Sequence, residues 1–261
     1  MFLDEFEKYK SQYEKGIKKI SFRSSYPKIM KEPIDLKLEK SFGNYDLFFN
    51  SKGLLLHSVH TEKYKNYKII YGYNRKGILI AAMSLLSEKN ELISLSEFEY
   101  DKKGRIETET VRLFYYNLGN DYTKEHIHTY TENKKEIFMT SDDEEEDEHT
   151  LYLTFDSKQR VIEEKAIRNE EELVWWHKNE FDNDGNVIRE ISLGENGEPN
   201  GVYEFLPFKN GKTSGYKYKS KDSSYLREYS FTLNEKGHWI NQVMMNDGEP
   251  IRYYSRELEY Y

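Results

Sequence analysis

A tight β-hairpin turn is encoded by Tyr100-Asp101-Lys102-Lys103-Gly104-Arg105-Ile106-Glu107. An extended run from residue 95 leads into this polar turn, and a second extended run follows it to residue 111. A three-residue hairpin loop usually combines a type I turn with a residue of positive φ, which glycine adopts without a steric penalty. Gly104 is therefore expected at the bulge position, with Tyr100 opposite Ile106.

The same pattern recurs along the chain from residue 45 onward. In each copy an apolar residue, usually aromatic, precedes the turn, and successive copies lie 24 to 30 residues apart. A steady period in this range is typical of repeat architectures. Two turns have Lys134 and Gln159 in place of glycine, so we expect them to be strained or differently shaped. The residues that precede the turns, which we call anchors, are Phe49, Tyr73, Tyr100, Tyr130, Phe155, Phe181, Phe208 and Leu233.

These hairpins predict an all-β fold, a long antiparallel meander of about eight repeats of ~26 residues in a twisted or curled open sheet. The 23 tyrosines suit the half-buried surface of such a sheet. Six of the hairpins place an apolar residue opposite the anchor, whereas Tyr130 faces Glu136. The six pairs are Phe49 with Leu55, Tyr73 with Leu79, Tyr100 with Ile106, Phe155 with Val161, Phe181 with Val187, and Leu233 with Trp239.

The N-terminal part of the chain has a different pattern. In residues 2–20 the apolar side chains follow one helical stripe, with acidic residues early and lysines late, an order that complements a helix dipole. We expect one helix here that caps an end of the sheet. Residues 21–40 contain Pro27 and Pro33 and are expected to form a connector. The predicted division is an N-terminal helix and connector, 1–40, and a β-hairpin repeat domain, 41–261.

The composition excludes several classes of protein. The formal net charge is −8, which argues against nucleic-acid binding through a basic surface. There are no cysteines, so disulfides, thiolate nucleophiles and Cys-ligated zinc are excluded. No apolar run reaches the length of a membrane-spanning helix, and the charged N-terminus lacks the apolar core of a signal peptide. These features predict a cytoplasmic protein that does not act at a membrane; a secreted protein that has lost its signal is the alternative.

Several turns resemble the YD or RHS repeat, whose pattern is Tyr/Phe-Asp-x-x-Gly-x-hydrophobic. Two further segments, 198–203 and 210–216, are similar to the MORN-like repeats of some bacterial antitoxin-type proteins. Together the resemblance covers residues 45–261 and implies a strip of hairpins that serves as a scaffold, shell or binding surface. It implies no catalytic residue and no cofactor, because the motif contains none. The YD-like turns are Tyr-Asp-Lys-Lys-Gly-Arg-Ile (100–106), Phe-Asp-Asn-Asp-Gly-Asn-Val-Ile (181–188) and Leu-Asn-Glu-Lys-Gly-His-Trp-Ile (233–240).

The most unusual segment is an uninterrupted acidic run. Like charges repel one another, so we expect a loop here instead of a strand. The run lacks the glycine and the alternating spacing of an EF-hand, so a tight Ca²⁺ site is not expected. Two interpretations stay open, a solvated connector and a surface that attracts a basic partner and speeds association. The run consists of Asp142, Asp143, Glu144, Glu145, Glu146, Asp147 and Glu148.

Two further pairs of residues are candidates for a site. Trp175 and Trp176 are adjacent, so on a strand they face opposite sides of the sheet, and one ring is available to anchor a partner. His126 and His128 share one face of a strand, with His126 expected opposite Thr140. Because the spacing fixes no third ligand, no metal site is predicted.

No catalytic constellation stands out in the sequence, and we predict a protein that is not an enzyme. The preferred hypothesis is a non-enzymatic protein-binding module, an immunity or antitoxin-like protein that occludes a basic toxin. Its acidic run would determine the rate at which the partner associates, and Trp175 or Trp176 would hold the complex together. The alternative is a structural repeat module of a larger surface or secretion assembly.

Overall fold

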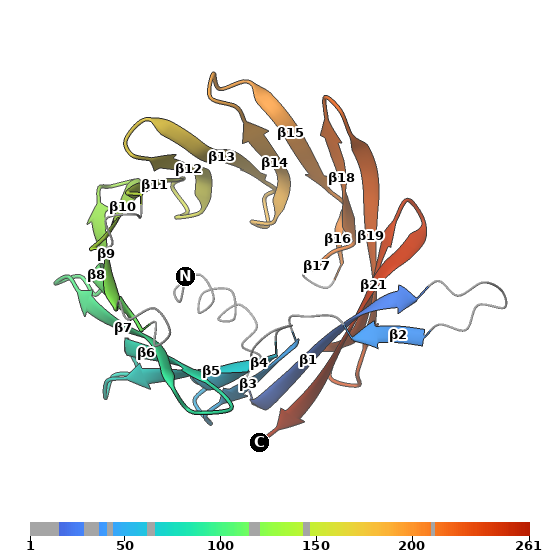
Figure 1. Ribbon diagram of the computed structural model, residues 1–261. Helices are drawn as coiled ribbons and strands as arrows, with labels where there is room; N and C mark the ends of the chain where they lie inside the picture. The colour runs from blue at the N-terminus through green and yellow to red at the C-terminus, as the bar shows by residue number, and fades with distance from the viewer. Residues whose placement is uncertain are drawn as a thin grey trace.

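The computed structural model describes residues 16–28, 37–40, 44–61, 66–114, 121–142, 147–209 and 212–261 of the chain. These residues form strands joined by short turns (Figure 1). The strands are β1 (Ile17–Lys28), β2 (Lys37–Lys40), β3 (Asn44–Phe49), β4 (Leu55–Thr61), β5 (Asn66–Tyr73), β6 (Leu79–Leu86), β7 (Leu92–Tyr100), β8 (Ile106–Leu113), β9 (Tyr122–Tyr130), β10 (Lys134–Ser141), β11 (His149–Phe155), β12 (Val161–Arg168), β13 (Glu172–Phe181), β14 (Val187–Leu193), β15 (Pro199–Phe205), β16 (Phe208–Lys209), β17 (Lys212–Thr213), β18 (Gly215–Ser220), β19 (Ser224–Leu233), β20 (Trp239–Asn246) and β21 (Glu249–Tyr260).

The main sheet closes on itself to form a barrel. It contains 19 strands, all in antiparallel pairs, and the 18 strands other than β2 form an unbroken ring. The ring closes at β1, which pairs with β3 on one side and with β21 on the other. Figure 1 shows the result along the barrel axis, with the first and last strands side by side.

The prediction of an open sheet is therefore wrong. An open sheet has two edge strands with unpaired backbone groups, whereas β1 satisfies both of its edges by pairing with β3 and β21. The predicted capping helix over 2–20 is also wrong where it can be compared, because Ile17 to Ile20 belong to β1. Residues 1–15 lie outside the described part of the chain. The predicted connector, 21–40, is strand over 21–28 and 37–40.

The predicted registers are confirmed in six of the hairpins. All six cross-strand pairs form. In each hairpin a β-bulge lies next to this pair, on its side away from the turn, as expected from the three-residue loop with positive φ. The turn at Gly104 shows the geometry, with φ of +77° and a hydrogen bond from Gly104 N to Asp101 O of 2.9 Å. The Asp101 carboxylate accepts further hydrogen bonds from the backbone of Lys103 (2.8 Å) and Arg105 (2.9 Å), which explains the acidic residue after the anchor.

The two turns without glycine differ from each other. Gln159 keeps the glycine conformation, with φ of +62°, and is therefore strained as expected. At Lys134 the loop changes shape instead, and the predicted register is wrong, because Tyr130 lies opposite Lys135 and not opposite Glu136. The copy anchored at Phe208 is not a barrel hairpin, because β16 and β17 form a separate two-stranded sheet and β15 pairs directly with β18.

The inner face of the barrel carries both apolar and polar side chains and is buried near the closure. One row of cross-strand neighbours can be followed over six strands, and none of its residues exposes more than 6% of its surface. The row is Ile20, Leu47, Ser58, Ile69, Ser84 and Ser94.

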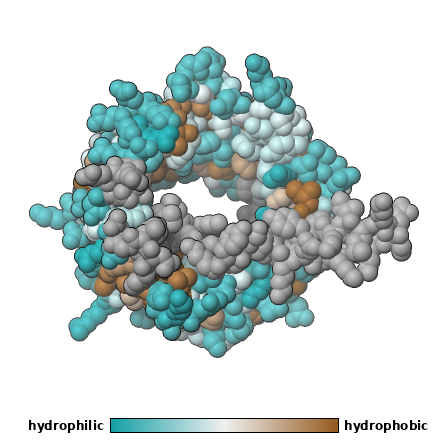
Figure 2. Space-filling view, in the orientation of Figure 1, coloured by the Kyte–Doolittle hydropathy of each residue, from teal (hydrophilic) through white to brown (hydrophobic). Residues whose placement is uncertain are grey.

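The outer face is charged and carries ion pairs between neighbouring strands. Glu97 of β7 lies 3.1 Å from Arg112 of β8, and Glu163 of β12 lies 3.5 Å from Lys178 of β13. Figure 2 shows hydrophilic residues over most of the outer contour and an opening at the centre of the ring. The buried core of the molecule thus lies inside the ring near the closure, and interstrand ion pairs lie outside it.

Candidate functional site

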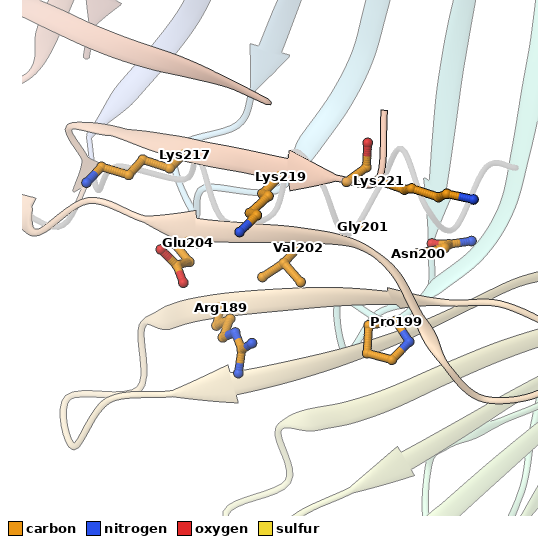
Figure 3. Close-up of a pocket in the computed structure, with 10 residues that line it drawn as sticks. Arg189, Pro199, Asn200, Gly201, Val202, Glu204, Lys217, Lys219 and Lys221 are labelled. Atoms are coloured by element: carbon orange, nitrogen blue, oxygen red, sulfur yellow. The ribbon is translucent and has the colours of Figure 1, made fainter. Parts of the chain in front are cut away.

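A cleft lies on the outer face of the barrel, where β14, β15 and β18 run side by side. Its volume is about 510 Å³. Figure 3 shows the side chains that project from these strands around it. The cleft is lined by Arg189, Pro199, Asn200, Gly201, Val202, Glu204, Lys217, Lys219, Ser220 and Lys221.

The cleft is basic on a protein that is acidic as a whole. Lys217, Lys219 and Lys221 are exposed, and none of them makes an ion pair with the residues that the structure describes. Arg189 does pair, at 3.1 Å, with Glu180 of β13. Glu204 is the one acidic side chain of the lining, so the cleft carries an excess of positive charge.

The local sequence explains how the lysines reach this face. Successive residues of a strand face opposite sides of the sheet, and β18 alternates tyrosines with lysines. The lysines therefore point outward, and Tyr216 and Tyr218 point inward. The ring of Tyr218 lies 4.7 Å from that of Tyr203 and covers the backbone of Gly201, where a Cβ atom would lie 3.0 Å from the Tyr218 hydroxyl. These aromatic contacts fix β18 against β15, and Val202 lies directly opposite Lys219 at the floor of the cleft.

Trp176 lies close to one end of the cleft. Its ring contacts the turn at Gly197, where a Cβ atom would lie 3.5 Å from the ring, and Pro199 of the cleft follows two residues later. The indole N–H donates to the Glu163 carboxylate at 2.8 Å, and the ammonium of Lys165 lies 4.9 Å from the ring centroid. Trp176 is therefore held rigidly on the outer face, half-buried.

Trp175 faces the opposite side of the sheet, as expected for adjacent residues of a strand. It lies opposite Ala166 of β12, which is buried, and its ring centroid is 5.5 Å from that of His177. The structure thus separates the two tryptophans. Only Trp176 is on the same face as the cleft.

The acidic run connects β10 to β11, and its described residues contact β9, the end of β12 and the turn after β12. Asp142 accepts a hydrogen bond from Thr123 N at 2.5 Å. Asp147 accepts from Asn169 at 2.8 Å and pairs with Arg168 at 3.3 Å. The hydrogen bond from Asn169 is the largest cause that holds the pKa of the Asp147 carboxyl below its ordinary value. Residues 143–146 lie outside the described part of the chain, so the structure does not test whether this loop attracts a basic partner.

His126 and His128 share the inner face of β9. His126 lies opposite Met139 and not Thr140, because the loop after Tyr130 lacks the glycine bulge and the register is displaced by one residue. Within the described residues there is no group of three or more histidine, cysteine, aspartate or glutamate side chains able to hold a metal ion. Those residues also include no helix that is long and apolar enough to cross a membrane.

Sequence reasoning missed the basic cleft, although part of it is visible in the sequence. The segment from Tyr216 to Lys221 alternates aromatic or small residues with lysines, which on a strand places the lysines on one face. Arg189 carries no such signal, since its place beside them depends on the register of β14, β15 and β18.

Comparisons with known proteins assign no family. No family model and no curated protein matches the chain. Among solved structures, it is similar to a porin-like protein from Bacteroides vulgatus, with 10% identity and a TM-score of 0.40 over 95% of this chain and 99% of the other. A porin-like protein from Bacteroides uniformis gives 7% identity and a TM-score of 0.35 over 93% and 98%. A chain of the Photorhabdus luminescens Tc holotoxin pore gives 10% and 0.24, over 84% of this chain and 16% of that one. TM-scores this low support no inference about this chain.

Proposed function

We propose that the chain is a non-enzymatic binding protein whose outer cleft binds an acidic segment of a partner protein. The observation that carries the proposal is the group of three exposed lysines, which make no ion pair with the described residues and lie beside Val202. Free charges at a surface attract an oppositely charged partner and speed its association. The rigidly held Trp176 supplies an aromatic contact next to them.

An acidic partner replaces the basic toxin of the sequence-based hypothesis. The immunity and antitoxin interpretation drew on the predicted cytoplasmic location, the negative net charge, the antitoxin-type resemblance and the absence of catalytic motifs, whereas the charges of the cleft are mostly positive. In the acidic run, Asp142 already contacts β9 and Asp147 already contacts the end of β12 and the turn after it, which favours a connector. The resemblance to YD, RHS and MORN-like repeats stays a prediction, as does the structural-module alternative.

The charged outer face bears on where the barrel works. Barrels that span a membrane present an apolar band to the lipid. Over the described strands the exterior instead carries ion pairs such as Glu97–Arg112 and Lys19–Asp46, so it suits water or a polar partner. The cytoplasmic localisation stays a prediction.

Binding of a fluorescein-labelled octaglutamate peptide tests the proposal. Fluorescence anisotropy is measured at two salt concentrations for the wild-type chain and for a variant in which Lys217, Lys219 and Lys221 are changed to Glu. We expect the variant to bind at least tenfold more weakly and with less salt dependence, because three of the contacts are charge pairs. An octaglutamine peptide should bind neither protein.

The matched control variant changes Lys52, Lys76 and Lys103, three exposed turn lysines, to Glu and so has the same net charge. It should bind like the wild type. Equal weakening in both variants would show that net charge and not the cleft governs binding, and the proposal would be rejected. A single-stranded oligonucleotide that binds the cleft more tightly than the peptide would also reject it.

A further inference from the structure

A second cluster of polar side chains lies inside the barrel, on β8 and β9. Glu109 of β8 lies directly opposite His126 of β9, and His128 follows on the same inner face. The Nδ1 atom of His126 lies 3.0 Å from Oε2 of Glu109, within hydrogen-bonding distance. Glu109 exposes 1% of its surface and His128 exposes 6%, so both belong to the interior.

The hydrogen-bonding capacity of this cluster is not satisfied. The Oε1 atom of Glu109 and both ring nitrogens of His128 are buried and have no hydrogen-bond partner in the part of the chain that the structure describes. A buried acceptor that loses its hydrogen bond to water costs roughly 1–3 kcal/mol, and more if it is charged. Native proteins rarely leave such groups unpaired, and each exception calls for an explanation, such as a functional role or a bound water or ion.

Burial also defines the chemical state of His128. Desolvation, followed by the nearby charges of Lys135 and His126, lowers the pKa of His128 to about 3. The ring is therefore neutral near pH 7, and one of its nitrogens is an acceptor. Glu109 and His128 are diagonal neighbours across β8 and β9, and such residues lie about 7–8 Å apart. They therefore place two unpaired acceptors in one region.

Two direct neighbours of the cluster are apolar, and the two lysines near it contact aromatic rings. Phe98 lies opposite Glu109 on β7, and Ile137 lies opposite His128 on β10. The ammonium groups of Lys124 and Lys135 each lie 5.5 Å from a ring centroid, that of Tyr122 and of Tyr130 respectively. Among the described residues, His126 is the one side chain within hydrogen-bonding distance of the Glu109 carboxyl group.

We propose that Glu109 and His128 form an internal binding site for an organic cation, a guanidinium or ammonium group. Such a group supplies several N–H donors and a positive charge, so it can donate to Glu109 Oε1 and to the neutral imidazole together. The 18-stranded ring surrounds this site, and the apolar neighbours exclude water from the ion pair. The site is independent of the outer cleft.

Methylguanidinium is the probe, and its binding to the full chain is followed by calorimetry and by the NMR signals of the histidine rings. We expect binding at pH 7 that perturbs the His128 ring and that weakens at least tenfold in Glu109→Gln. Glu107→Gln is the matched control, since Glu107 is an exposed residue on the same strand, and it should bind like the wild type. Urea, a neutral analogue of similar shape, should bind at least tenfold more weakly.

A second variant keeps the test independent of the folding of Glu109→Gln. His128→Phe preserves an aromatic ring and removes both nitrogens, so it should also weaken methylguanidinium binding. Equal affinity in the wild type and in either cluster variant would overturn the proposal. Equal affinity for urea, or no binding of methylguanidinium to the folded wild-type chain, would overturn it as well.

Discussion

Replacing Gln159 with glycine tests whether the shape of the hairpin turn is imposed on a residue that does not favour it. Gln159 has φ of +62°, and its N–H donates to Asp156 O at 3.0 Å, as in the turns that carry glycine. A non-glycine residue in this region costs roughly 1–2 kcal/mol. Glycine gives up about 0.5–1 kcal/mol of additional backbone entropy on folding. We therefore expect Gln159→Gly to stabilise the chain by about 0.5–1 kcal/mol.

The reverse change provides the matched control. Gly104 has φ of +77°, and a Cβ atom there would meet nothing within 4 Å, so Gly104→Gln introduces strain without a clash. Urea unfolding followed by circular dichroism should show a higher midpoint for Gln159→Gly, a lower midpoint for Gly104→Gln, and an unchanged slope in both. A lowered midpoint in Gln159→Gly would refute the reasoning, because the Gln159 side chain would then contribute more than the strain costs.

Two further predictions concern the packing of β18 and the buried imidazole. Gly215→Ala places a Cβ atom onto the carbonyl oxygen of Arg227 and 2.8 Å from the Cα of Glu228, so a loss of roughly 3 kcal/mol or more is expected. Thermal unfolding should show this against Gly16→Ala, which has no atom within 4 Å, and similar stability of the two variants would contradict it. Because burial lowers the pKa of His128 from 6.5 to about 3, the unfolded chain binds the proton first on acidification. Stability should therefore fall from about pH 6.5 to pH 3, by at most about 5 kcal/mol, and then level off; His128→Gln should flatten that part of the profile, and an unchanged profile would assign it to other groups.

The local features of the fold could be predicted because short segments determine them. The pairing of Tyr100 with Ile106 follows from the length of one loop and from a residue that favours positive φ. The closure of the barrel could not be predicted in this way. It depends on pairs such as Ile20 with Leu258, which lie far apart in the sequence, and on a segment whose apolar spacing also fits a helix.

For the candidate sites, too, the sequence predicts what depends on local geometry and fails where distant pairing decides. The opposite orientation of Trp175 and Trp176 follows from strand geometry alone and is confirmed. The partner of His126 was misplaced by one residue, because a turn without glycine changes the register of everything beyond it. Glu109 had no signal in the sequence, since its burial depends on which face of β8 turns inward.

The single closing seam has a consequence for how the barrel forms. Most neighbouring strands in the ring are also neighbours in sequence, so those pairs can form as local hairpins. The pairing of β1 with β21 instead joins residues 17–25 to residues 253–260 and requires almost the whole chain to be in place. Until it forms, the assembled hairpins are a strip with two free edges of 12 residues each, both able to pair with another chain. Variants that weaken this seam should therefore exchange strands between molecules and form swapped oligomers before they lose their hairpins.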